Sequence, residues 1–226
     1  KYDTLGRLTQ VIQPHESNAN AAGPVWKQDY DALNRLKSRT DPRNKVTSYA
    51  YDRLSRLQLV TLPDPDGPTV GSGTTATNTL PSPTIEYAYT QLGEVDFEKD
   101  HLGRKTDYSY DRLSRLKTVT SPDPDGAGAL TPLSTTTNYD RLGRVTSVVD
   151  QRNQTTNYVY NAVGWMEQVR SPDPDGPSGS LPELVSSMTY DLNGELRQQT
   201  SPGPNGSPLT VTYIRDALGR VTSIKA

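Results

Sequence analysis

The stretch Tyr51–Gly67, YDRLSRLQLVTLPDPDG, returns almost unchanged at residues 110–126 as YDRLSRLKTVTSPDPDG. Its first half belongs to a motif, Y-D-x-L-G-R-[LV], that occurs nine times in the 226 residues. The copies begin at Tyr2, Tyr30, Tyr51, Tyr89, Tyr110, Tyr139, Tyr160, Tyr190 and, with the tyrosine displaced, Ile214. So many spaced copies indicate a repeat architecture.

The motif predicts a tight β-hairpin. Asp at the first position of a type I turn accepts a hydrogen bond from the backbone N–H two residues on, and Gly three residues on takes the left-handed conformation that follows such a turn. Asn34 tolerates this conformation nearly as well, and Ser55 and Ser114 less comfortably. The predicted turn residues are Tyr2, Asp3, Gly6, Tyr30, Asp31, Tyr51, Asp52, Tyr110, Asp111, Tyr139, Asp140, Gly143, Tyr190, Asp191, Asp216 and Gly219.

Strands are expected on both sides of each turn. The residues before the turn are rich in Thr and Tyr, and two tyrosines at i and i+2 share one face of a strand, which predicts a paired aromatic ladder. The residues after the turn have apolar positions whose spacing slips between two and three, which indicates bulges or twist. The tyrosine pairs lie in TSYAY (47–51), TIEYAY (84–89), TDYSY (106–110) and TNYVY (156–160).

The links between hairpins alternate in length, so the architectural unit is two hairpins. This pattern predicts an all-β, antiparallel hairpin meander of about 16 strands with negligible helix. The tight turns would lie along one edge and the long links would project from the other. We expect residues 1–226 to form a single continuous array, a fragment of a larger protein. Short links are 41–45, 100–104 and 150–154; long links are 14–24, 63–83, 122–135 and 172–185.

The composition excludes several classes of structure and function. Only 32% of the residues are hydrophobic, beside 17 Gly and 18 Pro, so the chain cannot fill a thick core. The net charge of −2, with scattered Lys and Arg, argues against nucleic-acid binding. No apolar run is long enough for a membrane span. The absence of cysteine excludes disulfides and thiolate metal sites.

The DPDG links offer candidate calcium ligands, because carboxylates two residues apart can hold one hard cation. The residues that follow lack the further ligands of a calcium loop, and Pro before Asp with Gly after it suits a metal-free turn. The turn is the favoured interpretation, with no metal or other cofactor. The candidate ligands are Asp64, Asp66, Asp123, Asp125, Asp173 and Asp175.

Catalysis is not expected. The repeated Asp residues are equivalent, whereas a glycosidase needs one differentiated pair of carboxyl groups. His15 and His101 are the only histidines, and no nucleophile or phosphate-binding motif occurs. The chain is therefore expected not to be an enzyme.

The motif resembles the signature Y-D-x-x-G-R-[LI]-x-x-[VIT] of the RHS/YD-repeat family, across essentially the whole chain. That family includes bacterial Rhs polymorphic toxins, the B and C subunits of insecticidal toxin complexes, wall-associated proteins and teneurins. The resemblance implies a hollow β-shell that encloses a C-terminal payload, in a secreted or cell-surface protein. The family's self-cleaving core segment has no counterpart here.

Some copies depart from the motif, which limits any ladder of Asp–Arg pairs between neighbouring turns. Glu94, Trp165 and Glu195 replace the Arg, and Thr90 and Asn161 replace the Asp. Any Asp–Arg ladder between neighbouring turns must break at these positions. Asn161 can still cap a turn through its side-chain oxygen.

The expected function is a non-enzymatic structural segment of such a shell. The expected partners are the rest of the parent polypeptide or copies of the chain stacked at strand edges, and an enclosed payload. The alternative is a cell-surface adhesion or carbohydrate-binding module, whose tyrosines would stack on glycans. With one Phe and two Trp in the chain, packing is the favoured use of the tyrosines.

Overall fold

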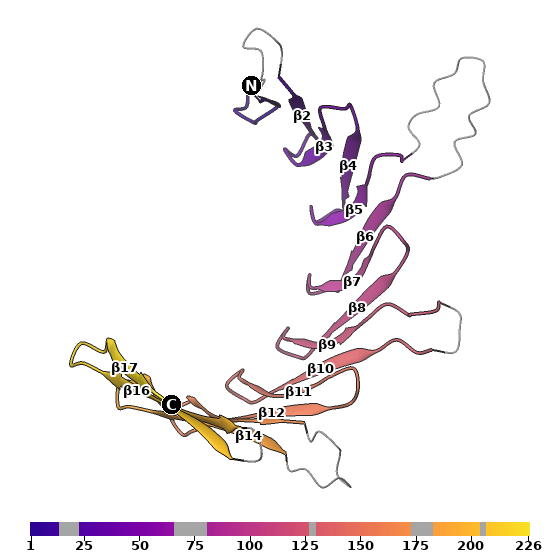
Figure 1. The fold of residues 1–226 in the computed structure, drawn as a ribbon. Coiled ribbons are helices and arrows are strands. Elements are labelled where there is room, and N and C mark those ends of the chain that lie inside the picture. Colours follow the sequence, from indigo (N-terminus) through magenta and orange to yellow (C-terminus); the bar gives the residue numbers. More distant parts are fainter. Residues whose placement is uncertain (14–22, 66–80, 127–129, 173–182, 204–206) are drawn as a thin grey trace, which may run out of the picture. The chain divides into compact units, whose positions relative to one another are not determined.

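The computed structural model describes residues 1–13, 23–65, 81–126, 130–172, 183–203 and 207–226. These residues form seventeen β-strands and no helix (Figure 1), so none of them forms an apolar helix that could cross a membrane. The chain divides into two units, Lys1–Tyr108 and Ser109–Ala226. Each unit is described by itself.

The first unit is a meander in which each strand pairs antiparallel with the next. Tight turns of the Tyr-Asp motif connect β2 to β3, β4 to β5 and β6 to β7. The strands are β1 (Gln10–Ile12), β2 (Val25–Tyr30), β3 (Leu36–Thr40), β4 (Val46–Tyr51), β5 (Leu57–Thr61), β6 (Thr84–Tyr89), β7 (Val95–Lys99) and β8 (Lys105–Tyr110), whose last two residues belong to the second unit.

The second unit repeats this arrangement, again with each strand antiparallel to the next. Its strands are β9 (Leu116–Thr120), β10 (Ser134–Tyr139), β11 (Val145–Val149), β12 (Thr155–Tyr160), β13 (Met166–Ser171), β14 (Leu184–Tyr190), β15 (Leu196–Pro202), β16 (Pro208–Arg215) and β17 (Val221–Lys225).

The predicted all-β antiparallel meander is confirmed, with seventeen strands where about 16 were expected. The count follows from the motif. Each of the nine copies is followed by a strand, and all but the first are preceded by one, because the first copy has only the isolated bridge Tyr2–Leu8. A single continuous array over residues 1–226 stays a prediction.

The expected bulges are present, at one fixed place in the hairpin. In β4–β5, Ala50 pairs with Leu59 but Tyr51 pairs with Leu57, so Gln58 has no opposite residue. The register shifts at the same position in six further hairpins. A bulge next to the turn increases the local twist of the strands.

Neither unit has a conventional core. Among the described residues, Val60 is the one buried hydrophobic side chain, at 8% exposure, and no polar residue is buried. Strand pairing and contacts between neighbouring hairpins must therefore supply most of the stability.

Candidate functional site

The Tyr-Asp turns are the candidate site, and the turn at Asp31 shows their local geometry. Asp31 Oδ1 accepts hydrogen bonds from the backbone N–H groups of Leu33 and Arg35, both at 2.9 Å. The Asp31 carbonyl accepts the N–H of Asn34 at 3.0 Å. Asn34 is left-handed, with φ of 65°. One carboxylate oxygen thus organises the whole turn through local bonds.

The other turns have the same backbone. The carboxylates of Asp3, Asp52, Asp111, Asp140, Asp191 and Asp216 accept the two equivalent N–H groups. The departures Thr90 and Asn161 also accept through their side-chain oxygens. The left-handed position is filled by Gly6, Asn34, Ser55, Gly93, Ser114, Gly143, Gly164, Gly194 and Gly219.

The second carboxylate oxygen binds the motif's Arg within the same turn. Arg35 Nε lies 2.7 Å from Asp31 Oδ2. A ladder of Asp–Arg pairs between neighbouring turns, as considered from the sequence, is therefore wrong, because each pair closes on itself four residues apart. The same pairing occurs in Asp3–Arg7, Asp52–Arg56, Asp111–Arg115, Asp140–Arg144 and Asp216–Arg220.

These contacts lower the pKa of the Asp carboxyl groups. For Asp31, the hydrogen bond from the Arg35 backbone N–H is the largest cause, with a further contribution from the Arg35 side chain. For Asp111 and Asp216 the arginine side chain contributes most. The pKa is lowered in the same way for Asp3, Asp52 and Asp140. The anionic form of these six carboxyl groups is thus stabilised.

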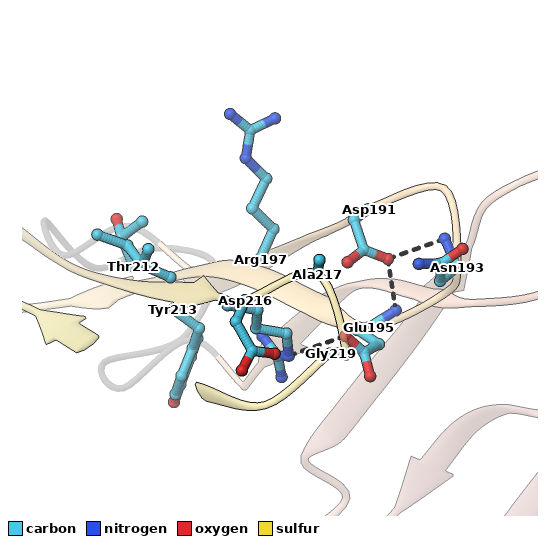
Figure 2. Close-up of a pocket in the computed structure, with 11 residues that line it drawn as sticks. Asp191, Asn193, Glu195, Arg197, Thr212, Tyr213, Asp216, Ala217 and Gly219 are labelled. Atoms are coloured by element: carbon cyan, nitrogen blue, oxygen red, sulfur yellow. Dashed lines mark hydrogen bonds and ion pairs between the residues drawn. The ribbon is translucent and has the colours of Figure 1, made fainter. Parts of the chain in front are cut away.

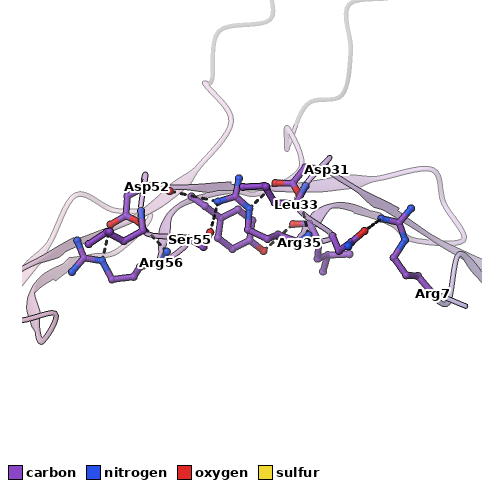
Figure 3. A network of polar contacts seen from close by, with 11 residues as sticks. Arg7, Asp31, Leu33, Arg35, Asp52, Ser55 and Arg56 are labelled. Carbon is purple, nitrogen blue, oxygen red and sulfur yellow. Dashed lines mark hydrogen bonds and ion pairs between the residues drawn. The ribbon is translucent and has the colours of Figure 1, made fainter. Parts of the chain in front are cut away.

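A second set of contacts joins each turn to the next one within the same unit (Figure 3). The Arg35 guanidinium lies over the Tyr51 ring, 4.6 Å from its centre. The Tyr51 hydroxyl donates to the Leu36 carbonyl at 2.9 Å, and Arg35 Nη1 donates to Ser55 Oγ at 3.1 Å. Burial raises the pKa of Tyr51. We name this contact the arginine–tyrosine step.

The arginine–tyrosine step recurs in both units, with ring distances of 4.4 to 4.8 Å. The tyrosine hydroxyl in each case donates to the carbonyl of the residue after the Arg. Within the predicted tyrosine pairs it is the second tyrosine that faces an arginine, as in Tyr51, Tyr89 and Tyr160, and the paired aromatic ladder itself stays a prediction. The further steps are Arg7–Tyr30, Arg56–Tyr89, Arg115–Tyr139 and Arg144–Tyr160.

The left-handed residue of the next turn lies beside the arginine. A Cβ added to Gly143 would lie 3.7 Å from Arg115 Nη1. Where Asn34 takes the glycine position, its Oδ1 accepts Arg7 Nη1 at 2.7 Å. The motif's Gly, Asn or Ser thus serves two purposes, the turn conformation and the contact with the preceding arginine.

Two steps in the second unit use different chemistry. Trp165, in the Arg position, packs on Tyr190 with ring centres 5.4 Å apart, and Tyr190 still donates to the Met166 carbonyl at 2.7 Å. A Cβ on Gly194 would lie only 2.7 Å from Trp165 Cζ2. The larger ring fills the space that a non-glycine residue would need.

In the last step, different residues replace both the arginine and the tyrosine (Figure 2). Glu195 takes the Arg position, and Arg215 rather than a tyrosine takes the Tyr position. Arg215 Nε lies 3.0 Å from Glu195 Oε2, an ion pair without hydrogen-bond geometry. Arg215 Nη1 donates to the Leu196 carbonyl at 2.7 Å, the acceptor that a tyrosine would use. A pocket of about 440 Å³ beside this pair is lined by Asp191, Arg197, Asp216 and Gly219, among others.

The short links are the same type of turn, which the sequence reasoning missed. Asp41 Oδ1 accepts from the N–H groups of Arg43 and Lys45 at 2.9 and 2.8 Å, and Asn44 is left-handed. Asp100 and Asp150 organise their links in the same way. The signal was present as Asp followed three residues later by Asn or Gly.

The calcium candidates are only partly within the described residues; Asp66, Asp173 and Asp175 lie outside them. Asp123 Oδ1 accepts the Asp125 N–H at 3.2 Å, and Asp125 Oδ2 accepts the Leu130 N–H at 3.1 Å. The described part of the chain holds no group of three or more His, Cys, Asp or Glu suited to a metal. These bonds are typical of a turn, and a metal-free link stays a prediction.

Comparisons with known proteins find matches to the same repeats. The RHS Repeat family matches residues 30–69 and 139–176, two segments that each contain Tyr-Asp turns. No curated protein is similar enough in sequence to count as a match.

Solved structures share the fold at low sequence identity. A crystal structure described as TcdB2-TccC3-Cdc42 matches with a TM-score of 0.62 and 17% identity, over 94% of this chain and 12% of that chain. A crystal structure of TcdB2-TccC3 gives 0.63 and 17%, over 93% and 12%. A Photorhabdus luminescens Tc holotoxin pore containing a TccC3 variant gives 0.62 and 17%, over 92% and 11%. The chain thus spans about one eighth of those chains and shares their fold, and two of its segments match the RHS Repeat family.

Proposed function

We propose that this chain is a non-enzymatic structural segment of a β-shell that encloses or displays a payload in a large secreted or surface protein of the toxin type. The observation that carries the proposal is the repeated step between neighbouring Tyr-Asp turns within each unit. It uses the Tyr, the Arg and the left-handed residue of the motif for contact between hairpins.

Stability in this fold must come from neighbours. An isolated two-stranded hairpin is marginal in water, and a repeat array gains its stability from the contacts between adjacent units. In each arginine–tyrosine step one side chain contacts its own turn, the next ring and the next turn, as Arg35 does with Asp31, Tyr51 and Ser55. Such a wall can extend without a thick core.

The motif's carboxyl groups are poorly suited to catalysis. A general acid or base works best with a pKa near the working pH. The contacts of Asp31 and Asp140 shift the pKa of both carboxyl groups in the opposite direction. These Asp residues are structural anions, which supports a role without chemistry.

The likeness to TcdB2-TccC3 supports the finer parts of the proposal. Because this chain spans about one eighth of those chains, we propose the rest of a parent polypeptide as its principal partner, with an enclosed payload. An extracellular or cell-surface location accompanies that role. No cofactor is proposed.

Hydrogen exchange followed by mass spectrometry tests the structural role on the full chain. Arg56→Ala removes the step to Tyr89, whereas Arg53→Ala changes an exposed arginine of the same turn. We expect faster exchange in β4 to β7 for Arg56→Ala only. Equal exchange in the two variants would contradict a wall held together by these steps.

Carbohydrate binding is the second candidate, favoured by one groove in the first unit. Tyr87 and Phe97 line it beside Glu86 and Gln58, in a volume of about 420 Å³. Aromatic faces with nearby polar groups can hold a sugar ring. A glycan array decides between the candidates: selective binding that Tyr87→Ala abolishes would favour this function, and uniform absence of binding would favour the shell.

A further inference from the structure

The contact between the turns at Asp191 and Asp216 uses side chains that the arginine–tyrosine steps do not use. Glu195 takes the Arg position, and its Oε2 atom lies 3.0 Å from Nε of Arg215, which takes the Tyr position. A Cβ added to the left-handed Gly219 would lie only 2.8 Å from Glu195 Oε1. We name Glu195, Arg215 and Gly219 the exchanged step. It lies between two hairpins of the second unit, β14–β15 and β16–β17.

The arginine–tyrosine steps are permissive by comparison. The left-handed residue beside the arginine is Asn34, Ser55 or Gly143 in three of them, and each is accommodated. The hairpins that begin at Tyr51 and Tyr110 share the sequence YDRLSRL. Several hairpins of the chain would therefore fit any one arginine–tyrosine step.

The exchanged step is selective in both directions. A tyrosine in place of Arg215 would put the negative face of its ring against the Glu195 carboxylate. An Asn or Ser in place of Gly219 would overlap the same carboxylate. Placing Arg215 against Arg144 would bring together two guanidinium groups whose side chains are only 20% and 29% exposed. Contact between like charges is an effective way to reject a wrong partner.

A chain of similar hairpins needs such selectivity when it folds. Repeat proteins misassemble when one repeat takes the place of another, within one chain or between chains. Register is weakly specified where alternative pairings make similar contacts, and a pair of surfaces that fit only each other removes those alternatives. We propose that the exchanged step fixes the order of the hairpins, because it forces β16 to pair with β15 when the chain folds.

Three versions of the full chain separate the chemistry of the step from its position. The wild type has the exchanged step at Glu195. A uniform variant, Glu195→Arg with Arg215→Tyr, converts it into an arginine–tyrosine step. A relocated variant carries these two changes together with Arg144→Glu and Tyr160→Arg, which rebuild the exchanged step where Gly164 already supplies the glycine.

Each version is refolded from urea at increasing protein concentration, and size-exclusion chromatography measures the fraction of monomer. We expect the uniform variant to lose at least half of its monomer at about 10 μM, and the relocated variant to match the wild type. Hydrogen exchange of the monomers should show two populations for β14 to β17 in the uniform variant and one in the other two chains. Urea unfolding checks that each monomer is folded.

A second comparison measures the selectivity without refolding. Asn adopts the left-handed conformation more readily than most residues, so Gly143→Asn and Gly219→Asn have similar backbone costs. Gly143→Asn, beside Arg115, copies the contact of Asn34 and should leave the melting temperature nearly unchanged. Gly219→Asn should lower the melting temperature of the wild type, but not that of the uniform variant, where Glu195 is replaced.

Equal monomer fractions and a single exchange population in the wild type and the uniform variant would overturn the proposal. So would a folded relocated variant whose monomer fraction is as low as that of the uniform variant. If the uniform variant gives no folded monomer, the two Asn substitutions in the wild type decide, and equal losses would remove the selectivity on which the proposal rests. The role as a wall segment is tested separately, by hydrogen exchange of Arg56→Ala.

Discussion

The turn at Asp31 and the turn at Asp191 share one backbone but contact their neighbours differently. Both Asp side chains accept the two turn N–H groups at 2.9 to 3.0 Å. Arg35 then stacks on a tyrosine, whereas Glu195 pairs with an arginine.

The difference shows that the turn and the step are separate functions of the motif. The turn needs an oxygen acceptor and a left-handed residue, and it tolerates Thr90 and Asn161. The step needs two side chains from different hairpins that fit each other, and it is met by Arg with Tyr, Trp with Tyr, or Glu with Arg. Substitution at one side of a step is tolerated when the other side matches.

Acid should produce the largest effect, because it acts on seven Asp residues whose pKa is lowered. A carboxyl group with a folded pKa below its unfolded value stabilises the fold above the unfolded value, near 3.8, and loses that contribution as the pH falls through the folded pKa. Urea unfolding at pH 6 and below pH 3 measures the loss.

The comparison sharpens this prediction, because the Trp165–Tyr190 contact contains no carboxyl group. Hydrogen exchange at low pH should show the arginine–tyrosine steps loosening before this contact does. Constant stability between pH 6 and pH 2 would contradict the contribution of the Asp–Arg pairs. Salt should reduce the effect, since the pairs are partly exposed.

Gly194→Ala should be the most destabilising single substitution considered. The residue is left-handed, which costs a non-glycine residue about 1 to 2 kcal/mol, and the new Cβ would overlap Trp165, which adds about 1 to 3 kcal/mol. Gly6→Ala is the matched control, because Gly6 is left-handed with nothing within 4 Å of the added atom. Thermal unfolding compares the two; equal losses would show that the tryptophan contact is unimportant.

The Glu195–Arg215 pair should behave as one unit in a double-mutant cycle. Glu195→Arg places like charges together, and Arg215→Tyr leaves Glu195 beside a ring, so each should destabilise by about 1 kcal/mol. The double variant rebuilds an arginine–tyrosine step and should recover most of the loss. If the losses of unfolding free energy measured in urea were additive, the two positions would not be matched.

Removing one hydroxyl should have the smallest effect. Tyr51→Phe deletes the hydrogen bond to the Leu36 carbonyl but keeps the ring under Arg35, which should cost about 1 kcal/mol. Tyr2→Phe, at an exposed ring, should change stability by less than about 0.5 kcal/mol. Equal melting temperatures for the two variants would show that the hydroxyl does not help to join hairpins.

Much of the fold could be predicted because it depends on contacts close in sequence. The Asp31 carboxylate reaches N–H groups two and four residues away, and Asn34 sits three residues on. Five consecutive residues therefore specify the turn. Because each turn reverses the chain, nine copies of it produce an antiparallel meander. The short links were missed, although the same local rule applies to Asp41 and Asn44.

The steps could not be predicted from the motif alone. Arg56 and Tyr89 are separated by a link of variable length, and only the strand register brings the guanidinium over the ring. The sequence suggested a displaced tyrosine near Ile214, but the register places Arg215 opposite Glu195. A hairpin motif carries no information about which side chain of the next hairpin lies across from it.

The sequence by itself thus determined the all-β repeat and the turns, because these follow from short-range hydrogen bonds repeated at regular spacing. Only the tertiary structure decided that arginine faces tyrosine and that Glu195 and Arg215 replace both partners together. The physical reason is that strand pairing joins residues far apart in sequence, and side-chain chemistry between hairpins depends on that pairing.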